Sequence, residues 1–148
     1  MEPMYLEDFA AGQVFRSGGY AVTEAEILDY ARRWDPQPFH LDDAAARGTL
    51  FGGLAASGWH TASMTMRLIV ESLHPAGGVI GGRMEMVEWP RPVRPGDVLR
   101  VESEVLEVKP SRSKPGQGML RLRCTTLNQR DEPVQIILPN LVVPRRPG

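Results

Sequence analysis

The sequence predicts an α+β fold, a single domain in which a long antiparallel sheet wraps around a buried central helix. The first observation is the run from Ser57 to Leu73, which is apolar around nearly its whole circumference, as expected of a helix that is buried on several sides. The second is a series of alternating runs rich in β-branched residues, at 78–89, 98–108, 119–127 and 134–143. A curved sheet packed on the helix would bury the apolar faces of both.

Before the central helix, the sequence favours one further helix and a short turn. Thr23 and Glu26 form a capping-box pattern, and apolar residues then recur at helical spacing, at Ile27, Tyr30, Ala31 and Trp34. This helix is expected to end at Asp35, because a proline follows. Asp42 can cap a short turn through 44–46.

The expected strands are joined by short connections, which makes them antiparallel. Within 98–108, apolar residues share one face and charged residues the other; the two sets are Leu99, Val101 and Val105, and Arg100, Glu102 and Glu104. The segment 18–22 can add a strand from the N-terminal side. Pro139 cannot donate to the strand ladder, which predicts a sheet edge or a bulge there.

Composition limits the classes of function. The 148 residues suit one domain, 1–148, and a net charge of −1 with scattered cations argues against nucleic-acid binding. The first thirty residues hold no apolar run, so we expect neither a signal peptide nor a membrane span, and a cytoplasmic location. Cys124 is the single cysteine, which excludes an intrachain disulfide and favours a small buried residue.

Two short segments carry the chemistry. Asp35 and His40 lie five residues apart in a stretch whose two prolines predict a non-helical loop. Alone, the pair would more often be a helix end and a satisfied loop histidine, and the surrounding pattern reverses that preference. The segment that begins at Ser57 and Gly58 opens the central helix, where Ser57 is expected to be the N-cap and free backbone N–H groups can stabilise a developing negative charge. Together these segments have the layout of an acid/base pair facing a helix N-terminus.

The ordered set of these segments resembles the MaoC-like dehydratase, or (R)-specific enoyl-CoA hydratase, family, whose domains have the hot-dog fold. Four segments carry the resemblance: Asp35-Pro-Gln-Pro-Phe-His-Leu-Asp42, Phe51-Gly-Gly53, Ala56-Ser-Gly58 and Pro92-Val-Arg-Pro-Gly-Asp97. Gln37 stands where the family usually has asparagine, and Ser57 where it usually has a second histidine.

The resemblance implies addition of water across the C2=C3 bond of a 2-enoyl-CoA to give a (3R)-hydroxyacyl-CoA, or the reverse. It assigns the acid/base work to Asp35 and His40, and oxyanion stabilisation to the Gly58 N–H group. Ser63 would hold the dyad or the water, and the expected substrate contacts are Ser57, Ser63, Phe39 and Phe51. No cofactor is expected beyond the coenzyme A of the substrate, and no metal.

Two other functions remain open, an acyl-CoA thioesterase and a non-catalytic acyl-CoA-binding subunit. A thioesterase would need a carboxylate near the start of the central helix, and residues 57–70 contain none. His60 is expected to be a packed histidine, and the spacing of His40, Asp42 and His60 matches no standard zinc site. Met64 and Met66 suit either core packing or an acyl tunnel.

Two expectations concern partners. A single sheet on one helix leaves an edge unpaired, so we expect a homodimer or a higher even oligomer. The densest basic stretch, at 109–116, is expected to project as a loop, either as a solvated turn or as a site for the coenzyme A phosphates through Lys109, Arg112 and Lys114.

Overall fold

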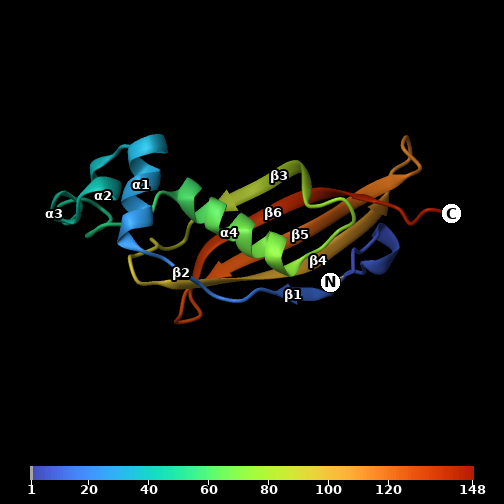
Figure 1. Cartoon of the computed structure of the whole chain (residues 1–148), viewed down its shortest axis with the longest axis horizontal. Helices are drawn as coiled ribbons and strands as arrows, with labels where there is room; N and C mark the ends of the chain where they lie inside the picture. The colour runs from blue at the N-terminus through green and yellow to red at the C-terminus, as the bar shows by residue number, and fades with distance from the viewer. Residues whose placement is uncertain (1) are drawn as a thin grey trace.

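The computed structural model describes residues 2–148 and contains one antiparallel sheet with helices on one face and at one end (Figure 1). The strands are β1 (Val14–Arg16), β2 (Tyr20–Ala21), β3 (Ile80–Glu88), β4 (Val98–Pro110), β5 (Gln117–Leu127) and β6 (Pro133–Pro144). They are arranged in the order β1-β4-β5-β6-β3, with β2 also paired to β4. The helices are α1 (Glu24–Trp34), α2 (Pro38–Leu41), α3 (Asp43–Ala46) and α4 (Gly58–Ser72), preceded by a 3-10 turn at Leu6–Asp8.

The central helix α4 runs along one face of the sheet, and the core lies between the two (Figure 1). Leu68 and Ile69 of α4 pack into the same apolar cluster as Val101 of β4 and Leu122 of β5. One polar contact crosses this core, where the hydroxyl oxygens of Thr65 and Thr126 are 2.6 Å apart. The predicted α+β fold, with a long antiparallel sheet and a central helix, is confirmed.

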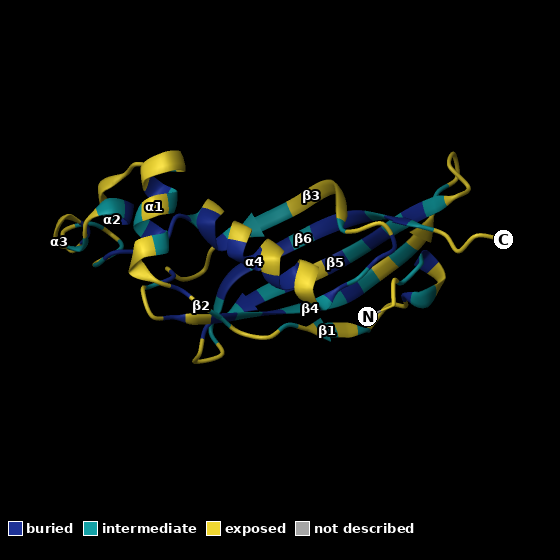
Figure 2. Cartoon of the chain, in the orientation of Figure 1, coloured by how far each residue is buried: buried dark blue, intermediate teal, exposed yellow. Residues whose placement is uncertain are grey.

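The burial predicted for α4 on several sides is wrong for the single chain. Buried residues occupy the side that faces the sheet, and Figure 2 shows exposed residues along the other side. Trp59, Met66 and Val70 are 60, 43 and 49 % exposed, and their spacing places them in one stripe. The sequence pattern shows that apolar residues lie on several sides of the helix, but the chain itself covers only the side that faces the sheet.

The prediction of a non-helical segment between Asp35 and His40 is also wrong. α1 ends at Asp35 as expected, but Pro38 begins the one-turn helix α2, which includes His40. Proline is tolerated at the first helical position because its missing N–H would have no partner there. The expected cap at Asp42 is confirmed, since its carboxylate accepts a 3.0 Å hydrogen bond from the Ala44 N–H and starts α3.

The sheet differs from expectation at its margins. β6 lies inside the sheet, so Pro139 is not at an edge; it pairs with Met84 of β3 at the start of a register shift, which confirms the alternative of a bulge. β1 was missed because its three residues are too few to show a period. At the opposite edge of the sheet from β1 lies β3, which within residues 2–148 pairs only with β6 and leaves its other edge open.

Candidate active site

The structure brings Asp35 and His40 together at the end of the molecule where α1, α2 and the start of α4 meet (Figure 1). Asp35 is the C-cap of α1, and His40 lies on α2 and is 3 % exposed. The distance from His40 Nε2 to Asp35 Oδ2 is 3.4 Å. The turn made by the prolines therefore places an imidazole nitrogen next to a carboxylate oxygen, as an acid/base pair requires.

The orientation of the His40 ring is fixed by a backbone group. His40 Nδ1 is 2.7 Å from the carbonyl oxygen of Ala55. Because a carbonyl can only accept, Nδ1 carries a hydrogen, and in the neutral ring Nε2 is then the unprotonated nitrogen. The basic nitrogen of His40 thus faces Asp35.

The Asp35 carboxylate has donors around it. Gln37, at the position that departs from the family pattern, donates through Nε2 to Asp35 Oδ1 at 2.6 Å. Burial raises the pKa of Asp35, but the Gln37 amide, the nearby Ser57 hydroxyl and the charge of His40 together lower this pKa below its ordinary value. Asp35 is consequently ionised at neutral pH and available as an acceptor for a water proton.

The start of α4 presents free donors to this pair. Ser57 is the N-cap residue, as expected, but its side chain makes no capping hydrogen bond. Its hydroxyl is buried and lies outside hydrogen-bonding geometry with any group in residues 2–148, although it is near enough to Asp35 to lower that pKa. With no side-chain cap and no acidic residue in the first turn, the N–H groups that begin at Gly58 keep their positive character for a ligand.

The other predicted contacts divide into two groups. Phe39 and Phe51 lie against the dyad, with ring centroids 4.6 and 5.6 Å from that of His40. Ser63 is exposed and donates to the Trp59 carbonyl at 2.9 Å, within the exposed stripe of α4. The structure therefore joins the two phenylalanines to the dyad and gives Ser63 no hydrogen bond to it.

The sequence did not point to Arg94, the residue that holds the segment 51–55 in place. Arg94 donates to the carbonyl oxygens of Gly53 at 2.8 Å and of Leu54 at 3.2 Å, and also to that of Phe51. These bonds fix the segment that supplies Phe51 and the Ala55 carbonyl. The signal was present in the 92–97 motif, but the contact spans about forty residues and has no local pattern.

The predictions for Cys124 and His60 are confirmed. Burial raises the pKa of the Cys124 thiol to about 11, so this cysteine is not a nucleophile at neutral pH. His60 is 6 % exposed and stacks on Tyr30 with the ring centroids 4.6 Å apart. Burial lowers the pKa of His60, partly offset by the charge of Glu26.

The buried His60 should make stability depend on pH. Its pKa in the folded chain lies below the unfolded value near 6.5, so the unfolded chain takes up the proton more readily as the pH falls below that value. Between pH 7.5 and 5.5 the wild type should therefore lose stability, by at most about 1.4 kcal/mol per pH unit from this group. Chemical unfolding of His60→Phe should show a smaller loss, and His74→Phe should behave as the wild type; equal losses in all three would contradict the assignment.

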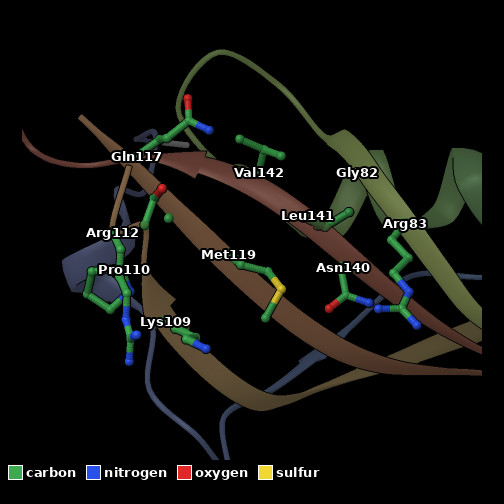
Figure 3. A pocket seen from close by; sticks show the side chains of 12 residues that line it. Gly82, Arg83, Lys109, Pro110, Arg112, Gln117, Met119, Asn140, Leu141 and Val142 are labelled. Atoms are coloured by element: carbon green, nitrogen blue, oxygen red, sulfur yellow. The ribbon is translucent and has the colours of Figure 1, made fainter. Parts of the chain in front are cut away.

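The basic loop lies away from the dyad. The β4–β5 connection projects at the opposite end of the sheet from α1–α3 (Figure 1). Lys109 and Arg112 line a pocket of about 570 Å³ on the sheet, together with Arg83 of β3, and no carboxylate lines it (Figure 3). Lys114 is on the same connection but does not line this pocket. The prediction that this loop projects from the sheet is confirmed. The dyad of the same chain lies at the other end of the sheet, away from the loop.

Neither a metal cluster nor a membrane helix is found in the part of the chain that the structure describes. Within residues 2–148, no three His, Cys, Asp or Glu side chains gather as metal ligands would. None of the helices in that range has the length and apolar character needed to cross a membrane.

Comparison with known proteins agrees with the geometry. Residues 8–126 match the family described as MaoC like domain. The MaoC-like dehydratase from Rhodospirillum rubrum is 51 % identical, with a TM-score of 0.94 over 98 % of this chain and 99 % of that one. The R-hydratase PhaJ1 from Pseudomonas aeruginosa is 26 % identical, with a TM-score of 0.76 over 97 and 88 %. A 3-hydroxybutyryl-CoA dehydratase from Methylorubrum extorquens is 28 % identical over 82 % of this chain and 73 % of its own length. The chain therefore belongs to the MaoC-like domain family and has the hot-dog fold.

Proposed function

We propose that the chain is a hydro-lyase that adds water across the C2=C3 bond of a 2-enoyl-CoA to give a (3R)-hydroxyacyl-CoA, or catalyses the reverse dehydration. The observation that carries this proposal is the 3.4 Å pair of His40 Nε2 and Asp35 Oδ2 beside the uncapped start of α4. Similarity to an R-hydratase and to a 3-hydroxybutyryl-CoA dehydratase supports it.

The chemistry follows from the protonation states of the dyad. With its Nδ1 hydrogen bonded to Ala55, the neutral form of His40 offers Nε2 as an acceptor beside the ionised Asp35, so one water can donate a hydrogen to each. The water oxygen forms a bond to C3 while one of its protons passes to the dyad, and the electrons of the double bond move toward the thioester carbonyl. The Gly58 N–H would stabilise the resulting enolate oxygen, and the dyad then returns a proton to C2. The net change is the addition of one water, with a hydroxyl group at C3 and a hydrogen at C2.

Two assays separate this reaction from the alternatives. The sole acidic residue of α4 is Glu71, in its last turn, which leaves no carboxylate at the helix start for a thioesterase. Purified protein mixed with crotonyl-CoA should therefore lose the absorbance of the conjugated thioester without releasing free thiol. Thiol release would instead support a thioesterase, and no change in either signal would support a non-catalytic binding subunit.

We also propose that the chain forms a two-fold homodimer through α4 and β3. Trp59, Met66 and Val70 expose apolar surface on α4, and Met84 of the open edge strand is 46 % exposed. A groove of about 320 Å³ lies between Met66 and Met84. A second copy would pair the strand edge and remove this surface from water.

Light scattering should give twice the chain mass of 16.4 kDa at micromolar concentration. Val70→Glu places a charge in the exposed apolar stripe and should weaken the dimer about tenfold, because the carboxylate would lose its water on association. Glu71→Ala, one residue away and outside the stripe, is the matched control. A wild-type monomer, or equal dimer dissociation constants for both variants across a dilution series, would contradict the proposed interface.

We further propose that the coenzyme A phosphates bind the basic pocket of the opposite subunit. β4 has 13 residues and spans about 43 Å, so the basic loop is too far from its own dyad for one substrate to reach both. A two-fold axis beside β3 makes the two edge strands antiparallel. This reversal brings the basic loop of one subunit to the end of the sheet that holds the other subunit's dyad.

A further inference from the structure

Trp89, which directly follows β3, lies over the first residue of α4. A Cβ atom built on Gly58 would be 2.7 Å from Trp89 Cε2 and 2.9 Å from both Cδ2 and Cζ2. No side chain can occupy that space while the indole is there. The glycine at the start of α4 is therefore required by Trp89.

The indole lies at the end of α4 that presents free N–H groups. In a helix, Cα–Cβ bonds tilt toward the N-terminus, so a ring at the Cβ position of Gly58 is on the side to which the first N–H groups point. A thioester oxygen held by the Gly58 N–H would consequently be next to the face or edge of Trp89.

The position of the indole is fixed by a buried amide. Trp89 Nε1 donates to Gln135 Oε1 at 2.8 Å, and Gln135 is fully buried on β6. The Nε2 atom of Gln135 is buried without a partner in residues 2–148, which is a cost to stability. Trp59 also packs edge-on against Trp89, with the ring centroids 5.2 Å apart. Among the described residues, only the oxygen of this buried amide has a hydrogen-bond partner, and that partner is the indole. We therefore attribute the burial of Gln135 to its bond with Trp89.

Trp89 shares a cleft with Phe51, which packs against His40 of the dyad. With Leu50 and Phe51 it lines a cleft of about 290 Å³. Phe51 packs against His40, so one wall of this cleft touches the dyad and another touches the start of α4. In the proposed function, the dyad and the start of α4 hold the reacting carbons between them, so the acyl group lies near Phe51 and Trp89.

We propose that Trp89 is a specificity-determining residue that restricts the substrates to 2-enoyl thioesters with hydrogen at C2. This rests on the proposed function, in which the Gly58 N–H holds the thioester oxygen. C2 is bonded to the carbonyl carbon, so a substituent on C2 would be held near the thioester oxygen and hence near the indole. Gln135 is a positioning residue that acts through Trp89.

The test compares crotonyl-CoA with its 2-methyl counterpart, (E)-2-methylbut-2-enoyl-CoA. Trp89→Ala should raise the ratio of kcat/KM for the methylated over the unsubstituted substrate by at least about tenfold, the usual range for one methyl group in a packed pocket. Trp89→Phe should change the ratio less, and Gln135→Met should shift it in the same direction as Trp89→Ala. Trp34→Ala, at a tryptophan 69 % exposed, should leave the ratio unchanged. An unchanged ratio in Trp89→Ala overturns the proposal.

Binding separates this proposal from the proposed reaction. Calorimetry with butyryl-CoA and 2-methylbutyryl-CoA gives a ratio of Kd values that needs no catalysis. If the wild type hydrates neither enoyl-CoA but Trp89→Ala shifts the binding ratio toward the methylated thioester, the role of Trp89 stands and the reaction does not. If the ratio does not shift, or neither thioester binds, the role of Trp89 is wrong.

A stability measurement tests the contact itself. Gly58→Ala should lower Tm by about 5 °C, because the new methyl group overlaps the indole. In a Trp89→Ala background, Gly58→Ala should lower Tm much less, because the indole that the methyl group would overlap is gone. The effects of the two changes on Tm should therefore not be additive. Gly48→Ala is the control, since a Cβ there meets nothing within 4 Å. Additive losses would show that the indole does not occupy this space in solution.

Discussion

Replacing Asp35 by asparagine, or His40 by alanine, is expected to lower kcat with crotonyl-CoA by about two to four orders of magnitude, the usual contribution of general acid/base groups. In the proposed mechanism both side chains act on one water, and His40 Nε2 and Asp35 Oδ2 are 3.4 Å apart. The double variant should therefore be little slower than either single one, because groups that act as a unit are not additive.

The controls use the same residue types outside the site. Asp29→Asn changes an exposed carboxylate on α1, and His74→Ala changes a histidine beyond the end of α4. Both should keep wild-type turnover, and circular dichroism should confirm that the dyad variants remain folded. Near-normal turnover in Asp35→Asn or His40→Ala would exclude the dyad from the chemistry.

The dyad could be predicted because its signals are local. Asp35 and His40 are five residues apart, and α1 ends where the sequence indicates. Proline rules gave the wrong local structure for His40, since they forbid a helix interior but permit a helix start, and Pro38 uses that exception. The pairing survived this error because one helical turn and a bent loop cover similar distances.

The surroundings of the dyad could not be predicted, because they depend on contacts between distant segments. The Ala55 carbonyl that orients His40 is a backbone group with no residue signature. Trp89 and Gln135 are joined across 46 residues, and neither stands in a motif. Likewise, the apolar pattern of α4 predicts residues that avoid water, but it does not tell which of them the sheet covers and which stay exposed in the single chain.

The basic pocket is expected to control the affinity for the coenzyme. Arg83→Ala, Lys109→Ala and Arg112→Ala combined should raise KM for a CoA thioester by about a hundredfold, equivalent to about 2.7 kcal/mol or slightly under 1 kcal/mol for each charged contact. Figure 3 places Arg83 on β3 and the other two cations on the β4–β5 side of the pocket, so phosphates at separate positions can each meet a cation. The kcat should hardly change, because these contacts are equally strong before and during the reaction.

Three comparisons decide whether this loss comes from the phosphates. The combined variant should use a truncated pantetheine thioester as well as the wild type does, since that substrate lacks the nucleotide. Lys114→Ala removes a charge from the same connection without touching the pocket and should have a much smaller effect. Raising the salt concentration should weaken CoA thioester binding in the wild type more than in the combined variant, because exposed charge pairs are screened. An equal loss on both substrates would mean that the three cations support the sheet and do not hold the coenzyme.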